Sequence, residues 1–272
     1  MNIGSSIVLI LGLYGFPELG LAGAAWETFF GAALRFTYLA VMMYRAHGVF
    51  FGVPGWQGGS LKLATRKQFR FSWPIAATFV SMTFANQACT AIYANLNVYQ
   101  FAAMTFIMSW VKIAGQLSYT WTQATGLLVA QSLVKSLPSA ALDEFLIRAW
   151  RGAFVAAAIV GLTYAFIILA TRWIYADLAV ETRTALLSFL PILLVVPFPR
   201  VSNAICGNVL CATSDSTFSM NISLGANWLF MVPMTALFVL ISDISVAWVF
   251  ALFFGEELVK FPFFHRRIWN KD

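Results

Sequence analysis

The chain has 272 residues, of which 60% are hydrophobic and only 10% are charged, and its mean hydropathy is +0.79. Soluble domains average about 45 to 50% apolar and about 25% charged residues, so the composition excludes an ordinary soluble protein and indicates a polytopic membrane protein. The formal net charge is +6, since 17 Lys and Arg stand against 11 Asp and Glu.

Apolar runs long enough to cross a bilayer follow one another along the whole chain. A transmembrane helix needs about 20 mainly apolar residues. The predicted spans cover roughly residues 1 to 15, 20 to 44, 71 to 94, 98 to 131, 150 to 174, 184 to 212, 216 to 241 and 245 to 263. Segments this long without two-residue alternation predict helices rather than barrel strands. The expected fold is an all-α membrane bundle with about eight transmembrane helices.

The basic residues indicate how the bundle is oriented. Twelve of the seventeen Lys and Arg lie in residues 45–70, 135–151 and 260–271, which alternate spans place on one side, whereas the opposite side has only Arg172 and Arg183. The positive-inside rule then predicts a multi-pass protein of the inner (plasma) membrane with both termini in the cytoplasm. The net charge therefore indicates topology and lipid contact rather than nucleic-acid binding.

Sequence signatures of enzymes and metal proteins do not emerge from the chain. Cys89, Cys206 and Cys211 fall inside predicted helices, where small packing residues are expected, and their spacing suits neither a disulfide framework nor a metal site. The two histidines, His47 and His265, fall in predicted loop and tail, where solvated surface is expected. We predict that the protein is not an enzyme and has no cofactor.

Several predicted spans carry a stripe of polar side chains at helical spacing. One span holds Thr105, Ser109, Lys112, Gln116, Tyr119 and Gln123 on a single face. Other spans hold Thr83, Asn86, Thr90, Tyr93 and Asn97, or Thr28, Gly31, Arg35 and Tyr38, or Ser219, Ser223 and Asn227. A lysine that faces lipid at a helix centre costs about 2.5 to 3.5 kcal/mol, so we expect the stripes to face one another.

Two interpretations of the stripes are open. They hold the bundle together through hydrogen bonds between helices, at about 0.6 kcal/mol per contact, or they line a water-accessible cavity that accepts a solute. Amides and hydroxyls alone do not decide between the two. Lys112 favours the cavity, because an unpaired cation inside the membrane is by default a candidate for a functional site.

The segment LPILLVVPFPR, residues 190 to 200, predicts a break in its helix. Pro197 and Pro199 lack an amide hydrogen, so the carbonyls of Leu193 and Val195 lose their helical partners. Arg200 follows directly and is expected either to donate to these carbonyls or to a solute, or simply to reach toward the membrane surface. Broken helices that line cavities are common in secondary transporters.

Several motifs, in order, resemble one family of transporters. The stretch LILGLYGFPELGLAGAAWETF (9 to 29) resembles the region between the fifth and sixth helices of multidrug and toxic compound extrusion (MATE) transporters. SWPIAATF (72 to 79) resembles the start of their seventh helix, and QATGLLVAQSLVKS (123 to 136) the end of their eighth. ICGNVLCATSDSTFSMNISLGANWLFMVPM (205 to 234) resembles the connection from the tenth to the eleventh helix, and FGEELVKFPFFHRRIW (254 to 269) the C-terminal end.

The resemblance implies an antiporter with two six-helix lobes around a central cavity, which exchanges organic solutes against Na⁺ or H⁺. Residues 1–45 would hold the last two helices of the N-lobe and 46–70 the cytoplasmic linker between lobes. Residues 71–263 would form the six-helix C-lobe and 264–272 a cytoplasmic tail. The rest of the N-lobe would then be missing from this chain, which would begin near the middle of the family's length.

One branch of the family binds its coupling cation through acidic residues on the seventh and tenth helices. Residues 74 to 96 and 184 to 212 contain no acidic residue, so that site is not supported here. The resemblance therefore implies a coupling carboxylate outside this chain, or Glu27, which stands where the family usually has alanine.

The main prediction is the C-terminal portion of a MATE-like antiporter that exports small organic solutes. We expect Lys112, Gln116, Asn86, Thr90, Tyr93, Asn227, Arg200 and Trp110 on the cavity wall, with Pro197 and Pro199 as the hinge. The cations favour an anionic or zwitterionic solute. Two alternatives are a flippase for lipid-linked oligosaccharides from the same superfamily, and a half-length membrane scaffold or degenerate product that does not transport.

Overall fold

The computed structural model describes residues 20–47, 60–135, 139–175, 178–242 and 244–269. Every regular element in these residues is a helix, so the predicted all-α fold class is confirmed. The predicted span at residues 1 to 15 lies outside the described residues. The chain divides into two compact units, Met1–Ala64 and Thr65–Asp272.

The described part of the first unit is mainly one long helix, α2 (Gly20–His47). Its aromatic residues are exposed: Trp26 stacks on Phe30 with ring centroids 5.7 Å apart, and both are more than half exposed. Large exposed aromatic side chains on a helix of this length fit contact with lipid or with another protein surface.

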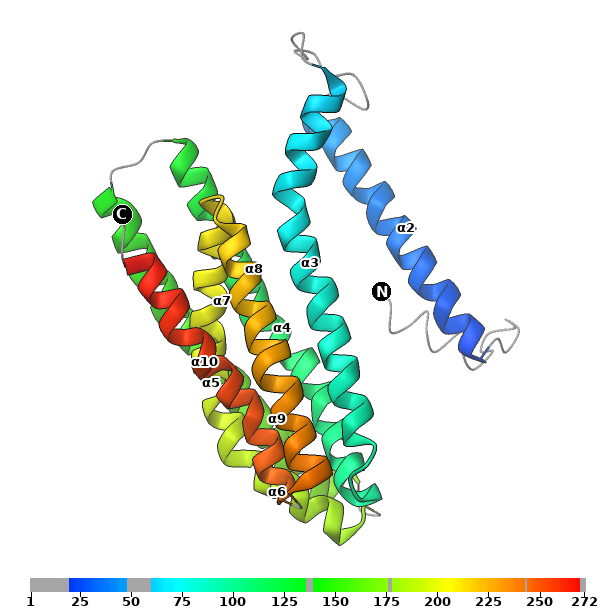
Figure 1. The fold of residues 1–272 in the computed structure, drawn as a ribbon. Coiled ribbons are helices and arrows are strands. Elements are labelled where there is room, and N and C mark those ends of the chain that lie inside the picture. Colours follow the sequence, from blue (N-terminus) through cyan, green and yellow to red (C-terminus); the bar gives the residue numbers. More distant parts are fainter. Residues whose placement is uncertain (1–19, 48–59, 136–138, 176–177, 243, 270–272) are drawn as a thin grey trace. The chain divides into compact units, whose positions relative to one another are not determined.

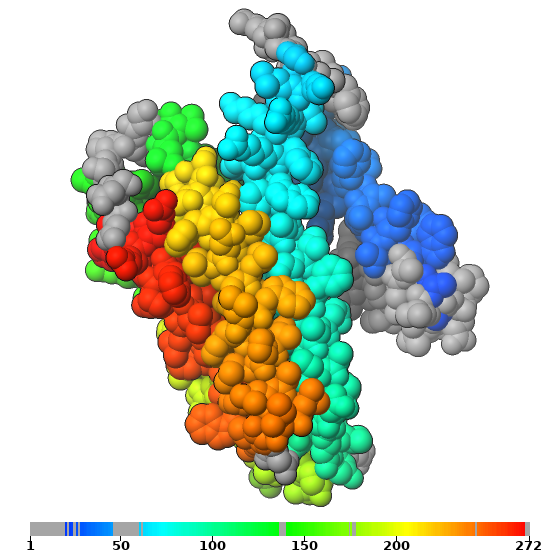
Figure 2. All heavy atoms as spheres, viewed as in Figure 1, coloured from blue at the N-terminus to red at the C-terminus, as the bar shows by residue number. Residues whose placement is uncertain are grey.

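The second unit contains the remaining helices, except for the first residues of α3, Leu61–Ala64; its long helices run side by side as a bundle (Figure 1). The remaining helices are α3 (Leu61–Tyr93), α4 (Val98–Val134), α5 (Ser139–Ile174), α6 (Val180–Val195), α7 (Pro197–Ala212), α8 (Ser216–Gly225), η2 (Ala226–Met231), α9 (Val232–Ala236), η3 (Leu237–Ile241) and α10 (Val246–Trp269). In the space-filling view α10 is red, α8 to η3 run from yellow to orange, and α3 is cyan to green (Figure 2).

Three helices extend well beyond the segments predicted from sequence. α3 begins at Leu61, inside the predicted linker 46–70, α5 begins at Ser139 rather than near 150, and α10 continues to Trp269, through most of the predicted tail. These extensions carry basic residues, which are good helix formers and stand at the ends of apolar runs. Hydropathy finds the apolar part of a helix and not its polar ends.

Three described helices are long and apolar enough to cross a membrane, at Lys62–Tyr93, Ala140–Trp173 and Ser216–Ile241, and the bent pair α6 and α7 makes a fourth. The sequence predicted about eight spans, more than the three or four described helices that are long and apolar enough. α4 has 37 residues but carries the polar stripe around Lys112, and α10 has 24 residues but carries Glu256 and Glu257. By its helix composition the chain is a multi-pass membrane protein.

The core of the second unit lies where α4, α6 and α10 meet. Met104 and Ile107 of α4, Leu186 and Phe189 of α6 and Phe250 of α10 are almost fully buried. The Phe189 and Phe250 rings stack with centroids 4.5 Å apart, an arrangement that adds about 0.5 to 1.5 kcal/mol beyond the burial of area.

Two spans depart from a straight α-helix. α6 and α7 meet at an angle of 45° at Val196, directly before Pro197, as the proline-rich segment predicts. The span Ser216–Ile241 contains two π-helical stretches, η2 and η3, on either side of the segment with Pro233. π-helical turns are rare and occur often at functional sites; Asn227 lies in the first of them.

Candidate transport cavity

A cavity of about 770 Å³ lies inside the second unit. Every span of this unit contributes to its wall, including Asn86 from α3, Lys112 from α4, Tyr164 from α5, Asn227 from η2 and Glu256 from α10. A volume of this size falls within the range of small-molecule sites, about 300 to 1,000 Å³.

Most of the side chains expected on the cavity wall lie there. Lys112, Gln116, Asn86, Thr90, Tyr93, Asn227 and Arg200 all line the cavity, and Pro197 does as well. Trp110 and Pro199 do not line it. Glu27 lies on α2, but its side chain is outside those that the structure describes.

Lys112 is exposed and lines the cavity next to Gln116, one helical turn further along α4. Among the described residues it makes no ion pair or hydrogen bond, in contrast to the other basic residues on the wall. An ammonium group without a partner in a cavity between membrane helices favours an acceptor or an anion there.

Polar groups of α3 and α9 lie together behind another part of the wall, which Cys89 lines. The Cys89 thiol lies 3.8 Å from the Thr235 hydroxyl, and both residues are buried. Tyr93, only 4% exposed, lines the same cavity, and its hydroxyl has no hydrogen-bond partner among the described residues. A buried hydroxyl without a partner costs about 1 to 3 kcal/mol, so a ligand or water that accepts from it stabilises the site.

Beside Arg200, the structure adds three charged residues of α10 that sequence reasoning missed, Glu256, Glu257 and Lys260. Arg200 of α7 donates from Nε to Oε1 of Glu257 on α10 at 3.2 Å, and Lys260 pairs with Glu256 within α10. Side-chain exposure is 39% for Arg200 and 8% for Glu257, and 12% for Lys260 and 10% for Glu256. All four residues line the cavity. We call Arg200, Glu256, Glu257 and Lys260 the charged quartet.

The quartet changes the expected charge of the cavity. The sequence suggested a cationic interior from Lys112 and Arg200, with Arg200 donating to the free carbonyls at the proline break or to a solute, or reaching toward the membrane surface. Instead, Arg200 pairs with Glu257, so two acids balance two bases in the quartet, and Lys112 is left as the cation without an ion pair among the charged residues described on the wall.

Asn203 ties the quartet to the broken span. Its Nδ2 donates both to the backbone carbonyl of Glu257 at 2.8 Å and to Glu257 Oε2 at 3.0 Å. Its own Oδ1 is buried and has no partner among the described residues.

The i, i+4 spacing of Glu256 and Lys260 on α10 is a sequence signal that could have located the charged quartet.

Further polar contacts link the C-terminal part of α10 to α7 and to the turn that follows α7. His265 Nε2 lies 2.9 Å from the Ser202 hydroxyl, which also accepts from Trp150 Nε1 at 3.1 Å. Arg267 Nε donates to Asp215 Oδ2 at 2.8 Å. His265, expected as solvated surface, is a packing residue that joins α5, α7 and α10.

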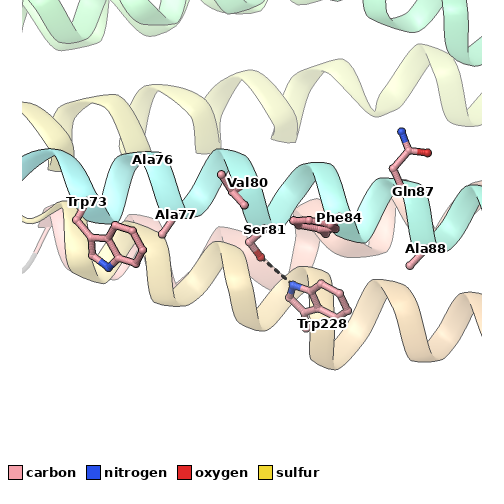
Figure 3. A pocket seen from close by; sticks show the side chains of 9 residues that line it. All are labelled: Trp73, Ala76, Ala77, Val80, Ser81, Phe84, Gln87, Ala88 and Trp228. Carbon is pink, nitrogen blue, oxygen red and sulfur yellow. Dashed lines mark hydrogen bonds between the residues drawn. The ribbon is translucent and has the colours of Figure 1, made fainter.

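A second hollow, of about 800 Å³, lies on α3 and η2 (Figure 3). Its wall is mainly apolar, with Trp73, Val80, Phe84 and Trp228, and Trp228 Nε1 donates to the Ser81 hydroxyl at 2.8 Å. It contains no charged residue among those that line it. Its character fits lipid contact or packing rather than recognition of a polar solute.

These features define a multi-pass helical membrane protein with a polar cavity and a broken span. No protein-family model matches the chain, and no curated protein matches it. Solved structures do match. A MOP superfamily transporter from Pyrococcus furiosus, whose binding pocket is described as having reverse polarity, has a TM-score of 0.74 at 16% identity over 98% of this chain and 60% of its own.

Two further structures have the same fold. A MATE protein in its straight conformation has a TM-score of 0.73 at 17% identity, and covers 98% of this chain and 60% of its own. An outward-facing multidrug resistance MATE transporter of the MOP superfamily has a TM-score of 0.70 at 15% identity with the same coverage, 98% and 60%. The chain therefore has a MATE-like fold, which confirms the resemblance seen in the sequence, and it spans about 60% of the length of these proteins.

Proposed function

We propose that this chain forms the C-lobe side of a MATE-like secondary active transporter that exports small organic solutes in exchange for Na⁺ or H⁺. The observation that carries the proposal is the cavity of about 770 Å³, whose wall collects polar side chains from every span of Thr65–Asp272. The MATE-like fold supports the same function, at the level of architecture.

The broken span supports a moving lobe. α6 and α7 meet at 45° beside Pro197, and Arg200 follows on the cavity wall. Discontinuous helices next to the binding site are a recurring part of transporters that alternate between two open states. In this proposal Pro197 and Pro199 form the hinge, in an inner membrane with both termini in the cytoplasm.

The solute in this proposal is anionic or zwitterionic. Lys112 lies on the wall without an ion pair among the described residues, and Tyr93 offers a hydroxyl without a partner. The flippase alternative requires several cations along the groove for a pyrophosphate, and the pairing of Arg200 with Glu257 leaves fewer of them unpaired. The geometry therefore favours the solute exporter.

The test uses membrane vesicles that contain the protein and an imposed Na⁺ or H⁺ gradient, with radiolabelled caproate as an anionic probe. Lys112→Met should lower gradient-driven movement of caproate about tenfold, since a charge-assisted hydrogen bond contributes about 1.5 to 3 kcal/mol. Lys135→Met, at an exposed position after α4, is the control and should leave movement unchanged.

Two results would count against these assignments. Equal movement by wild type and Lys112→Met, at equal amounts of protein in the membrane, would remove Lys112 from the solute site. Absence of gradient-driven movement of every probe by the wild-type protein would overturn the transporter proposal itself and favour the scaffold.

A further inference from the structure

The contact between α7 and α10 leaves donors unused. The guanidinium of Arg200 has five N–H donors, and in the described residues only Nε is used, on Glu257 Oε1 at 3.2 Å. The Arg200 side chain is 39% exposed and lines the cavity. A planar fork of this kind matches a carboxylate with two parallel hydrogen bonds.

The same contact leaves an acceptor unused. Asn203 is 3% exposed and spends both of its amide hydrogens on Glu257. Its Oδ1 has no donor within the described residues, although buried acceptors in native proteins are almost always satisfied. A cationic N–H group bound between Asn203 and Glu257 would supply the missing donor.

The charge balance selects the kind of ligand. The charged quartet contains two acids and two bases, paired Arg200–Glu257 and Lys260–Glu256. Adding a net anion or a net cation to a balanced group of charges on the wall of a membrane cavity leaves one charge without compensation, which is unfavourable at low dielectric. A ligand that carries one charge of each sign keeps the balance.

We propose that Arg200, Glu257 and Asn203 form a subsite for a zwitterionic solute, an amino acid-like molecule with its carboxylate on the guanidinium and its ammonium between Glu257 and Asn203 Oδ1. This subsite rests on the proposed transport function and names its substrate class. It lies in the same cavity as Lys112 but uses different side chains. An experiment can therefore disprove this subsite and leave the role proposed for Lys112 in place.

The experiment compares three probes with the same carbon chain at neutral pH: ε-aminocaproate as the zwitterion, caproate as the anion and hexylamine as the cation. Equilibrium binding is measured on the full chain in lipid nanodiscs. Wild-type protein should bind ε-aminocaproate about tenfold more tightly than either of the other two, because only the zwitterion makes both charge-assisted contacts.

Two variants should then change which probe binds most tightly, one to the anion and the other to the cation. Glu257→Gln keeps the shape but leaves Arg200 unpaired, so caproate should become the tightest ligand. Arg200→Gln leaves Glu257 unpaired, so hexylamine should become the tightest ligand. Glu144→Gln, which removes the exposed Glu144–Arg148 pair on α5, is the control and should keep the wild-type order.

Each outcome decides a specific point. Tightest binding of caproate or hexylamine by wild type, or an unchanged order in Glu257→Gln, overturns the zwitterion subsite. Gradient-driven movement of caproate together with such a result would leave the proposed transport function in place. Thermal unfolding of each variant is measured alongside, and Glu257→Gln, the nearly isosteric change, decides the matter if Arg200→Gln does not fold.

Discussion

Glu256 and Lys260 of the charged quartet should each contribute to the stability of the fold only as long as the other is present. They form an i, i+4 pair on α10, and their side chains are only 10% and 12% exposed. Removing one partner of a buried pair leaves the other charge buried without compensation, which costs about 3 to 5 kcal/mol, whereas replacing both partners is often close to neutral. The pair therefore behaves as one unit in mutagenesis.

Lys260→Met should lower the thermal unfolding temperature of the protein in detergent or nanodiscs by several degrees, because Glu256 loses its partner. The double variant Lys260→Met, Glu256→Gln should recover most of that loss. Arg148→Met is the matched control, since the Arg148–Glu144 pair has side chains 74% and 65% exposed and exposed pairs contribute little. A double variant no more stable than Lys260→Met would contradict the pairing.

At the scale of helices, the crossing of α4 and α7 depends on one glycine. A methyl group at Gly126 would lie 2.8 Å from Cβ of Asn208 and 3.2 Å from its backbone oxygen. Backbone atoms cannot move away as a flexible side chain can. Small residues at membrane helix crossings allow this kind of close approach, so α4 and α7 pack with their backbones nearly in contact.

Gly126→Ala should lower the unfolding temperature, because the added methyl group forces α4 and α7 apart. Gly225→Ala at the end of α8 is the control, since nothing lies within 4 Å of the added atom there and Ala is favoured over Gly in helices by about 1 kcal/mol. Differential scanning fluorimetry on both variants measures the contrast. An equal effect of the two changes would mean that the α4–α7 contact is not under this constraint.

The elements also show what the sequence can and cannot predict. The polar stripe at helical spacing placed Lys112 and Gln116 on the cavity wall because helix period alone decides which residues share a face. The proline segment predicted the bend of 45° before Pro197 for a similarly local reason. Both features depend on neighbours in sequence.

The parts that were missed depend on neighbours in space. The Arg200–Glu257 pair joins residues that are 57 positions apart, and nothing local in either segment indicates the partner. Trp110 directly follows Ser109 and so stands off the polar stripe, and it does not line the cavity; in this case the helix period argues against the prediction. The π-helical stretches at Ala226–Met231 and Leu237–Ile241 have no sequence signal that the helix period can detect.

At the scale of the whole molecule, the basic residues predict which side of the membrane each connection faces. Asn95 lies in the turn before α4 and Lys135 directly follows it, and both are exposed. A helix of 37 residues is about 55 Å long, enough to carry these two positions to opposite sides of a bilayer about 40 to 45 Å thick.

Single cysteines at these two positions test the orientation, in a background with Cys89, Cys206 and Cys211 changed to alanine. A thiol reagent that does not cross membranes should label Asn95→Cys in intact cells. It should label Lys135→Cys only after the membrane is permeabilised, as expected if this end faces the cytoplasm. The opposite pattern would invert the predicted topology.

The pairing within the charged quartet also decides how the membrane voltage acts on the cavity. A unit charge that crosses the full membrane field changes in energy by about 2.3 kcal/mol per 100 mV. The quartet contains two charges of each sign and so feels almost no net force. Lys112, well inside α4 and without an ion pair among the described residues, is therefore the charge described on the wall on which the field acts without a compensating partner.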